Sequence, residues 1–147
     1  MSNSNVNSRY VLEMKTVQIA PMRTLMTALK DILLETNIVF SQDQFDQQGN
    51  LVSPAGIRII NMDKSHTILA HLFLDALKFE QFYCKHPKII IGVNMFHLFK
   101  LINTIDNDDT LTIYIEEKDY SDGIVEYLGL KFENGDIKQM KIQKLKL

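Results

Sequence analysis

Apolar residues recur at spacings of three and four in two stretches of the chain, and this spacing predicts two amphipathic helices. The first covers 21–35, and its apolar side comprises Met22, Leu25, Met26, Leu29, Ile32 and Leu33. Pro21 suits its first turn, where a helix needs no N–H. The second covers 95–104, with Asn94 as its N-cap. Its apolar side comprises Met95, Leu98, Phe99 and Ile102.

Alternating or continuous apolar runs predict the strands. These runs are 9–18, 37–42, 56–62, 66–75, 87–93, 110–117, 125–133 and 137–147. The strand over 66–75 carries apolar residues on both faces, so we expect both faces to be covered. The segment 43–54 is polar and contains Gly49 and Pro54, which predicts a loop. Residues 1–8 are rich in Asn and Ser, and we expect a flexible tail there.

The order of these elements repeats once along the chain. Each half is predicted as strand, helix and three strands, although few residues are identical between the halves. We therefore expect two βαβββ units packed as one α+β domain over 9–147, with both helices on one face of antiparallel sheet. A chain of 147 residues is long enough for one such core.

Composition narrows the classes of function. The chain has 16 basic and 18 acidic residues, so a protein that coats nucleic acid over its whole surface is excluded and any basic surface is local. Cys84 is the only cysteine, which excludes an internal disulfide and favours a reducing compartment and an inert thiol. No apolar run approaches the roughly 20 residues of a membrane span, and the first residues lack a signal peptide's apolar region. We expect a soluble, intracellular protein without a membrane partner.

Motifs for catalysis are missing from the sequence. There is no glycine motif for phosphate, no GxSxG and no HExxH, and the four histidines have no metal-ligand spacing. The acidic stretch 106–109 lacks the glycine and the distal glutamate of a calcium loop, so a solvated turn is the better interpretation. We predict no enzyme, no cofactor and no metal site.

Three cations occupy corresponding positions on the polar sides of the two predicted helices. Arg23 and Lys30 are seven residues apart and share one side of the first helix, and Lys100 has the analogous position on the second. The residues alone allow two interpretations: a solvated helix face or a surface for an anionic partner.

Four stretches, taken in order, resemble the amino-terminal domain of the DNA sliding clamp family, proliferating cell nuclear antigen. They are "ALKDIL" (28–33), "GIRIINMDKSHTILAHLFL" (56–74), "FYCKHPKIIIGVNMFHLFKLI" (82–102) and "NDDTLTIYIEE" (107–117). The most specific parts are "MDKSH" from Met62 to His66 and "GVN" from Gly92 to Asn94. The resemblance covers 9–145 and implies the DNA-clamp fold.

The resemblance also implies a function. Members of the family close into a ring around duplex DNA, act as non-catalytic processivity factors for DNA polymerase in replication and repair, and are loaded by a clamp loader. By position, Arg23, Lys30, Lys100 and Asn103 are implied as DNA-facing, while Thr24 and Asn103 stand where relatives often have lysine. The implied assembly of the full-length protein is a homotrimer, located in the nucleus or, for a virus, in the host cell's replication compartment.

Two further surfaces are implied by position. Met62, His66, Thr67 and Leu69 match one wall of the pocket that receives short peptides of partner enzymes, with Thr67 in place of a more apolar residue. Residues of the last strand match the subunit-contact edge: Ile137, Lys138, Met140, Lys141 and Ile142. The rest of the pocket would lie beyond Leu147, so we expect the chain to be the first half of a clamp; a native one-domain clamp is the alternative.

Two other functions remain open at this level. One is a clamp-like damage-checkpoint subunit that forms a mixed ring with different chains. The other is a free-standing peptide-binding adaptor that uses the surface from Met62 to Leu69 and never encircles DNA. The bias toward Ile, Lys, Asn and Asp is typical of an AT-rich genome, such as that of a large DNA virus or a protist.

Overall fold

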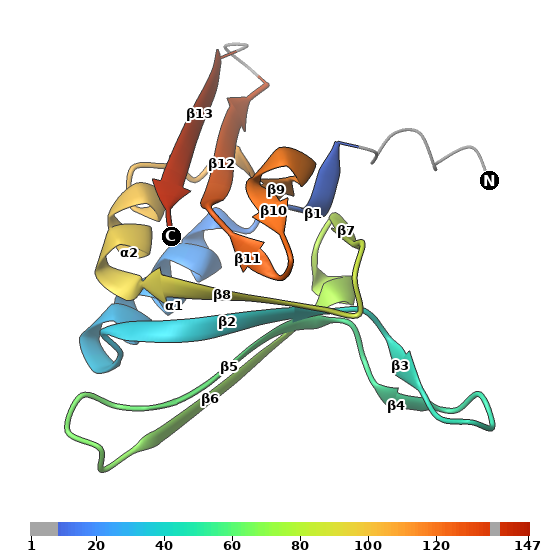
Figure 1. The fold of residues 1–147 in the computed structure, drawn as a ribbon. Helices are drawn as coiled ribbons and strands as arrows, with labels where there is room; N and C mark the ends of the chain where they lie inside the picture. Colours follow the sequence, from blue (N-terminus) through green and yellow to red (C-terminus); the bar gives the residue numbers. More distant parts are fainter. Residues whose placement is uncertain (1–8, 136–138) are drawn as a thin grey trace.

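The computed structural model describes residues 9–135 and 139–147 (Figure 1). The predicted tail 1–8 and two predicted interface residues, Ile137 and Lys138, lie outside the described residues. The helices are α1 (Ile19–Ile32) and α2 (Met95–Ile102), with 3-10 turns η2 (Ala76–Lys78) and η3 (Glu117–Asp119). The strands are β1 (Tyr10–Thr16), β2 (Glu35–Ser41), β3 (Gln44–Phe45), β4 (Leu51–Ser53), β5 (Gly56–Met62), β6 (Leu69–Asp75), β7 (Gln81–Cys84), β8 (Lys88–Asn94), β9 (Thr110–Glu116), β10 (Tyr120–Ser121), β11 (Ile124–Val125), β12 (Tyr127–Asn134) and β13 (Gln139–Lys146). Neither described helix is long and apolar enough to cross a membrane.

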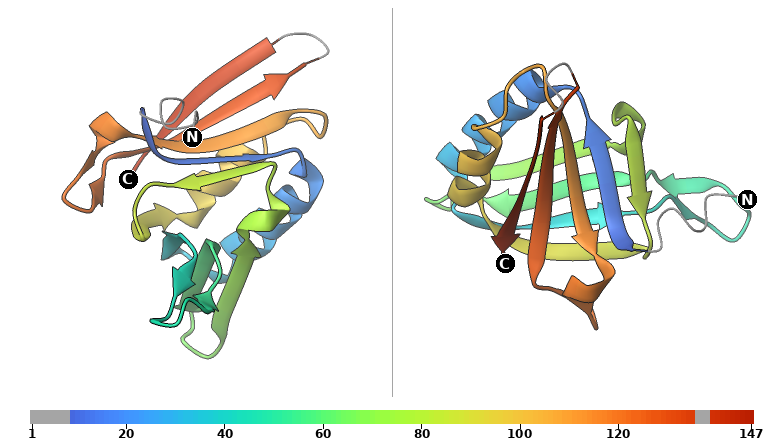
Figure 2. Two further views of the ribbon diagram at one scale, coloured as in Figure 1. Left: turned by 90° about the vertical axis from the view of Figure 1, so that its right-hand side faces the viewer. Right: turned by 90° about the horizontal axis from the view of Figure 1, so that it is seen from above.

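Two antiparallel sheets form the body of the domain. One has the order β13-β12-β9-β1-β7 and the other the order β6-β5-β2-β8. The predicted α+β class and the two βαβββ units are confirmed: β1, α1, β2, β5 and β6 form the first, and β8, α2, β9, β12 and β13 the second. The first strand of each unit pairs with a strand of the other unit: β1 pairs with β9, and β8 pairs with β2. Seen from above, one sheet lies over the other and both helices lie along one side (Figure 2).

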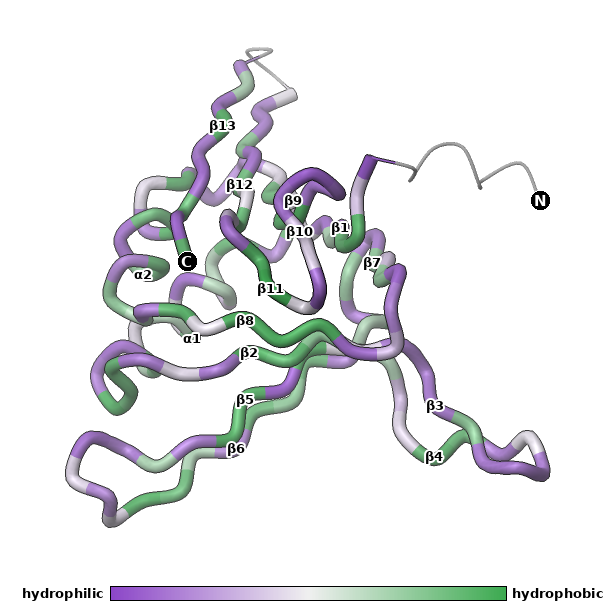
Figure 3. The backbone as a smooth tube through the Cα atoms, viewed as in Figure 1, coloured by the Kyte–Doolittle hydropathy of each residue, from purple (hydrophilic) through white to green (hydrophobic). Residues whose placement is uncertain are grey.

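The two sheets and the two helices enclose a single apolar core. Side chains from β1, β2, β5, β6, β9, β12, α1 and α2 surround one small apolar cavity of about 40 Å³. The predicted apolar side of α1 is confirmed by the burial of Met22, Met26 and Leu29, and that of α2 by Met95, Leu98 and Ile102. Hydrophobic stretches follow β2 and β8 beside the core, whereas the β3–β4 tip is hydrophilic (Figure 3).

The helix ends follow their local chemistry. The helix α1 begins two residues before the predicted start and contains Pro21 in its first turn. It ends at Ile32, because Leu33 adopts an extended conformation while its N–H still reaches the Leu29 carbonyl. The predicted cap of α2 is confirmed, since the Asn94 side chain accepts a 3.1 Å hydrogen bond from the His97 N–H.

The prediction that both faces of the strand over 66–75 are covered was wrong. The observed strand β6 begins at Leu69, forms an edge of its sheet, and none of its residues is buried. The β5–β6 hairpin extends past the body of the domain, so the apolar residues near its tip have no layer over them (Figure 1). One face of β6, with Ala70, Leu72 and Leu74, packs against the core, and only the opposite face, with Leu69 and Phe73, is exposed.

The segment 43–54, predicted as a loop, contains the hairpin β3–β4. The Asp46 carboxylate accepts hydrogen bonds of 2.9 Å from the N–H groups of Gln48 and Asn50, and Gly49 supplies the positive φ of 86° that the turn requires. Arg58 fixes the base of the hairpin by donating to the Ser53 hydroxyl and the Pro54 carbonyl, each at 2.9 Å. A polar composition did not prevent strand pairing in this segment.

Candidate functional site

The four predicted DNA-facing residues lie on two neighbouring helices. Arg23 and Lys30 belong to α1, Lys100 belongs to α2, and Asn103 follows α2 as its C-cap. The two helices pack against each other, so side chains 70 or more positions apart in sequence form one surface. Lys100 and Asn103 are exposed, whereas Arg23 and Lys30 are half-buried.

Lys30 and Lys100 each lie near an aromatic ring of α2. The Lys30 ammonium is 4.8 Å from the centroid of the Phe99 ring, and it forms a 2.6 Å ion pair with Asp31 on the surface. The Lys100 ammonium is 5.5 Å from the centroid of the Phe96 ring, and among the described residues it has no acidic partner. The Asp31 carboxylate is exposed, so its ion pair with Lys30 contributes little stability and both ammonium groups are available to an anion.

Arg23 makes different contacts, with the turn that joins α2 to β9. Its Nη1 donates to the Asn107 side-chain oxygen at 2.6 Å, and its Nη2 donates to the Ile105 carbonyl. The side chain is on the predicted helix surface, but its guanidinium is directed to the protein itself.

The predicted partner surface is on the exposed β5–β6 hairpin. Met62 and Leu69 form the last cross-strand pair, while His66 and Thr67 lie in the connecting turn. The residue Ile60 shares the outward face with Met62, and its side chain is 58% exposed; that of Leu69 is 62% exposed. A contiguous apolar surface of this kind is typical of a protein contact site.

One carboxylate holds this turn in shape. Asp63 Oδ1 accepts the N–H groups of Thr67 at 2.8 Å and Ile68 at 3.0 Å, and Oδ2 accepts the Ser65 hydroxyl at 2.7 Å. His66 takes a left-handed φ of 60° within it. Hydrogen bonds from Ile68, Ser65 and Thr67 lower the pKa of Asp63 from 3.8 to about 2.

The predicted subunit-contact strand is the outer edge of the five-stranded sheet. Within the described part of β13, Met140, Lys141 and Ile142 are exposed, and β12 is the only neighbouring strand. Lys144 ties β13 to its own sheet through Glu116 at 2.6 Å and Asp119 at 3.2 Å. The hydrogen bond from Lys144 lowers the pKa of Glu116, and the same bond raises the pKa of Lys144. The edge itself keeps unpaired backbone groups.

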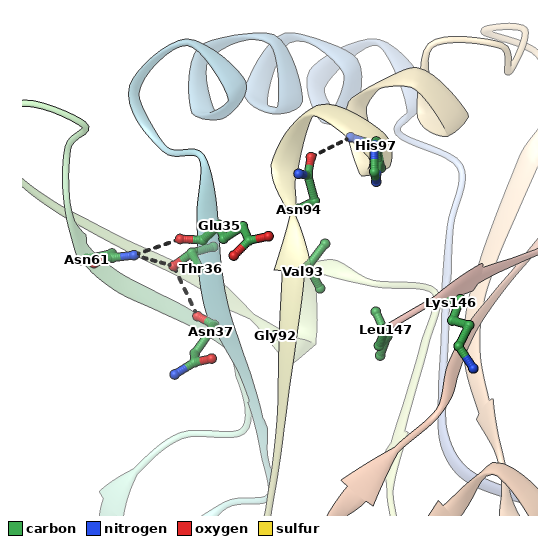
Figure 4. A pocket seen from close by; sticks show the side chains of 10 residues that line it. All are labelled: Glu35, Thr36, Asn37, Asn61, Gly92, Val93, Asn94, His97, Lys146 and Leu147. Atoms are coloured by element: carbon green, nitrogen blue, oxygen red, sulfur yellow. Dashed lines mark hydrogen bonds between the residues drawn. The ribbon is translucent and has the colours of Figure 1, made fainter.

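A polar pocket of about 520 Å³ lies beside these surfaces, and sequence reasoning missed it (Figure 4). It is lined by the start of β2, the end of β8 and the end of β13, together with Asn61 and His97. The Asn61 amide donates to the Glu35 carbonyl and the Thr36 hydroxyl, both at 3.1 Å. None of the predicted site residues lines it. The "GVN" motif from Gly92 to Asn94 forms part of its lining, but the other lining residues come from elements that are distant along the chain, so no local pattern indicated a pocket.

Comparison with known protein families assigns the chain to one of them. Residues 11–147 match the family described as "Proliferating cell nuclear antigen, N-terminal domain". The chain belongs to this family. Its predicted membership, which rested on "MDKSH" and "GVN", is thereby confirmed, and so is the fold that the membership implied.

Relatives of this proliferating cell nuclear antigen domain occur in viruses and eukaryotes. The chain is 37% identical over 81 residues to the "Probable DNA polymerase sliding clamp" of Acanthamoeba polyphaga mimivirus, covering 55% of the chain and 17% of the relative. It is 30% identical over 111 residues to the "Probable DNA polymerase sliding clamp 1" of Paramecium bursaria Chlorella virus 1. This match covers 76% of the chain and 36% of the relative. It is 28% identical over 137 residues to the "Proliferating cell nuclear antigen" of Chaetomium thermophilum. This match covers 93% of the chain and 46% of the relative. The matches span less than half the length of these relatives.

We expect the turn at Asp63 of this proliferating cell nuclear antigen domain to resist acid. A folded pKa of about 2 lies below the ordinary 3.8, so the stabilising contribution of the carboxylate is fully present above 3.8 and is lost as the pH falls through 2. The amide resonances of Thr67 and Ile68, followed by NMR during acid titration, should therefore change with a midpoint near 2.

The matched control for this titration is Asp63→Asn, which keeps the side-chain size and removes the charge. Its amides should show no such midpoint. A midpoint at 3.8 in the unmodified protein would contradict the hydrogen-bonded turn.

Proposed function

We propose that the chain is one domain of a DNA sliding clamp, a non-catalytic processivity factor that keeps DNA polymerase on duplex DNA. The observation that carries the proposal is the shared surface of α1 and α2, where Lys30 and Lys100 are available to phosphates. The names of the two viral relatives, which both describe a DNA polymerase sliding clamp, support it.

The chemistry of this surface suits movement along DNA. Lysine ammonium groups attract the phosphates equally at every position along the duplex, and contacts to phosphates carry no sequence information. The interaction energy is then similar at every register, so the protein slides. A closed ring, rather than tight binding, keeps it on the DNA, and the net charge of -2 is compatible with this role.

Ring closure requires further domains, and the edge strand β13 is the proposed contact. Its unpaired backbone groups and the exposed side chains of Met140, Lys141 and Ile142 would pair with a strand of the next subunit. In the full-length protein we propose a homotrimer. A clamp loader would open it, and it would act where DNA is replicated, in the nucleus or in a viral replication compartment.

Partner enzymes would dock on the β5–β6 hairpin. The apolar side chains of Met62 and Leu69 are exposed next to a turn that Asp63 holds in place, so the surface is preformed. A short apolar peptide of a polymerase or a repair enzyme fits this chemistry. Thr67 offers less apolar area than a larger side chain would, and a weak peptide affinity is expected.

The proposal predicts a dependence on DNA topology. The full-length protein, loaded by its clamp loader, should remain on closed circular DNA and dissociate when the circle is linearised, because a ring slides off a free end. Retention is measured by gel filtration of the protein–DNA complex before and after cleavage at one site. Equal loss from circular and linear DNA would overturn the proposal.

An adaptor that never encircles DNA is the second candidate, favoured by the exposed apolar surface of the β5–β6 hairpin. The variant Lys100→Ala separates the two functions. It should weaken DNA association for a clamp and leave it unchanged for an adaptor.

A further inference from the structure

Both terminal nitrogen atoms of Arg23 donate hydrogen bonds within the protein. Nη1 and Nη2 donate to Asn107 and to the Ile105 carbonyl on the α2–β9 turn, and Nε is buried without a hydrogen-bond partner. These contacts direct the guanidinium to the turn instead of outward to a phosphate. Lys100, by contrast, is exposed and has no acidic partner among the described residues.

The turn that Arg23 contacts is compact and acidic. Ile105 anchors it in the core, with 2% of its surface exposed. The Asp109 N–H donates to the Asp106 carbonyl at 3.0 Å, and the Asp106 N–H donates to the Asp109 carboxylate at 3.3 Å. Together with Asp108, three carboxylates lie in four residues, so a fixed cation beside them reduces their mutual repulsion.

The same turn contacts the edge strand on its other side. Asp106 and Asp109 line a small pocket of about 50 Å³ together with Gln139 and Lys141 of β13. The turn thus lies between the helix surface that carries the cations and the strand that carries the proposed subunit contact.

We propose that Arg23 is a positioning residue that fastens the acidic α2–β9 turn between α1 and β13, and that it supplies no phosphate contact. The inference rests on the proposed function for its DNA context and refines it. The phosphate-binding charge of this domain is then confined to Lys30 and Lys100. Arg23 stabilises the surroundings of the subunit edge instead.

Two substitutions of Arg23 distinguish positioning from phosphate binding. Arg23→Lys keeps the positive charge but lacks the forked donors that reach two acceptors at once, whereas Arg23→Ala lacks both. A positioning residue fails in both variants, while a phosphate contact is largely kept by lysine. The first readout is amide hydrogen exchange of residues 104–109 in the 147-residue protein. The second is the salt dependence of DNA association of the full-length protein.

We expect both Arg23 variants to raise exchange in the turn by about tenfold or more, since hydrogen bonds of charged groups contribute roughly that factor to local stability. Asn107→Ala removes one acceptor and should raise exchange less, and it provides a milder test where the Arg23 variants fold poorly. The slope of log affinity against log salt should stay at its unmodified value in Arg23→Lys and Arg23→Ala. Lys100→Ala should reduce it by about 0.9 for each phosphate that the protein no longer neutralises.

Unchanged exchange in the turn would overturn the inference. A reduced salt slope in Arg23→Ala that Arg23→Lys restores would overturn it as well. If Lys100→Ala leaves the slope unchanged, the proposed function fails, yet the exchange measurement still decides the role of Arg23.

Discussion

Cutting the chain between its two repeated units should abolish folding of both parts. Fragments 9–86 and 87–147 each contain one complete βαβββ unit, yet the first strand of each unit loses the strand with which it pairs in the other unit. Without β9, the first fragment exposes one edge of β1, whose Leu12 and Met14 are fully buried in the intact chain. Without β2, the second fragment leaves β8 with no partner strand. The loss amounts to the whole stability of a small domain, about 5–15 kcal/mol.

Circular dichroism during heating measures this outcome. Each fragment alone should show no cooperative transition, and an equimolar mixture should recover one because the first strand of each unit finds its partner again. The mixture is the matched control, since it has the same residues and the same break. A cooperative transition in either fragment alone would show that the units are independent, contrary to the observed pairing.

Gly129→Ala should destabilise the domain by about 1–3 kcal/mol, the usual cost of overpacking a core position. Gly129 lies directly opposite Tyr114 in the β9–β12 pair, and the tyrosine ring lies over it. An added Cβ would stand 2.3 to 2.6 Å from three ring atoms, and Tyr114 is only 7% exposed, so its ring has little room to move. Thermal unfolding of the variant and the unmodified protein measures the difference.

Gly92→Ala is the matched control for this substitution. Gly92 also lies in a strand, but the nearest atom to an added Cβ is the Asn37 side-chain oxygen at 3.6 Å, an ordinary contact. This variant should be neutral or slightly more stable, because alanine reduces the entropy of the unfolded chain. The double variant Gly129→Ala with Tyr114→Leu should lose less stability than the sum of its single changes. A midpoint for Gly129→Ala equal to that of Gly92→Ala would refute the steric argument.

Local patterns predicted much of the fold because they depend on neighbours in sequence. The apolar spacing in α1 and α2 and the Asn94 cap require only residues within one or two turns of helix. The short strand β7, which pairs with β1, was missed, as was the small hairpin β10–β11. Strands of two to four residues are too short for alternation to be distinguished from a turn.

The candidate surfaces divide in the same way. Positions within "MDKSH" placed Met62 and His66 on the hairpin that the structure leaves exposed, and helical spacing placed Lys100 on an open helix face. Helical spacing also placed Arg23 there, but its hydrogen-bond partners lie 82 and 84 residues further along the chain. No local pattern reports contacts over that separation.

The sequence by itself determined the two helices, most of the long strands, the repeated order of elements and the family. Each of these depends on periodicity or on a short contiguous motif. The tertiary structure alone decided which strands pair, which edges stay open and which cations remain available to an anion. Those properties arise when backbone groups and side chains from distant segments compete for the same partners. Here β1 pairs with β9, β8 pairs with β2, and Arg23 forms hydrogen bonds with the acidic turn.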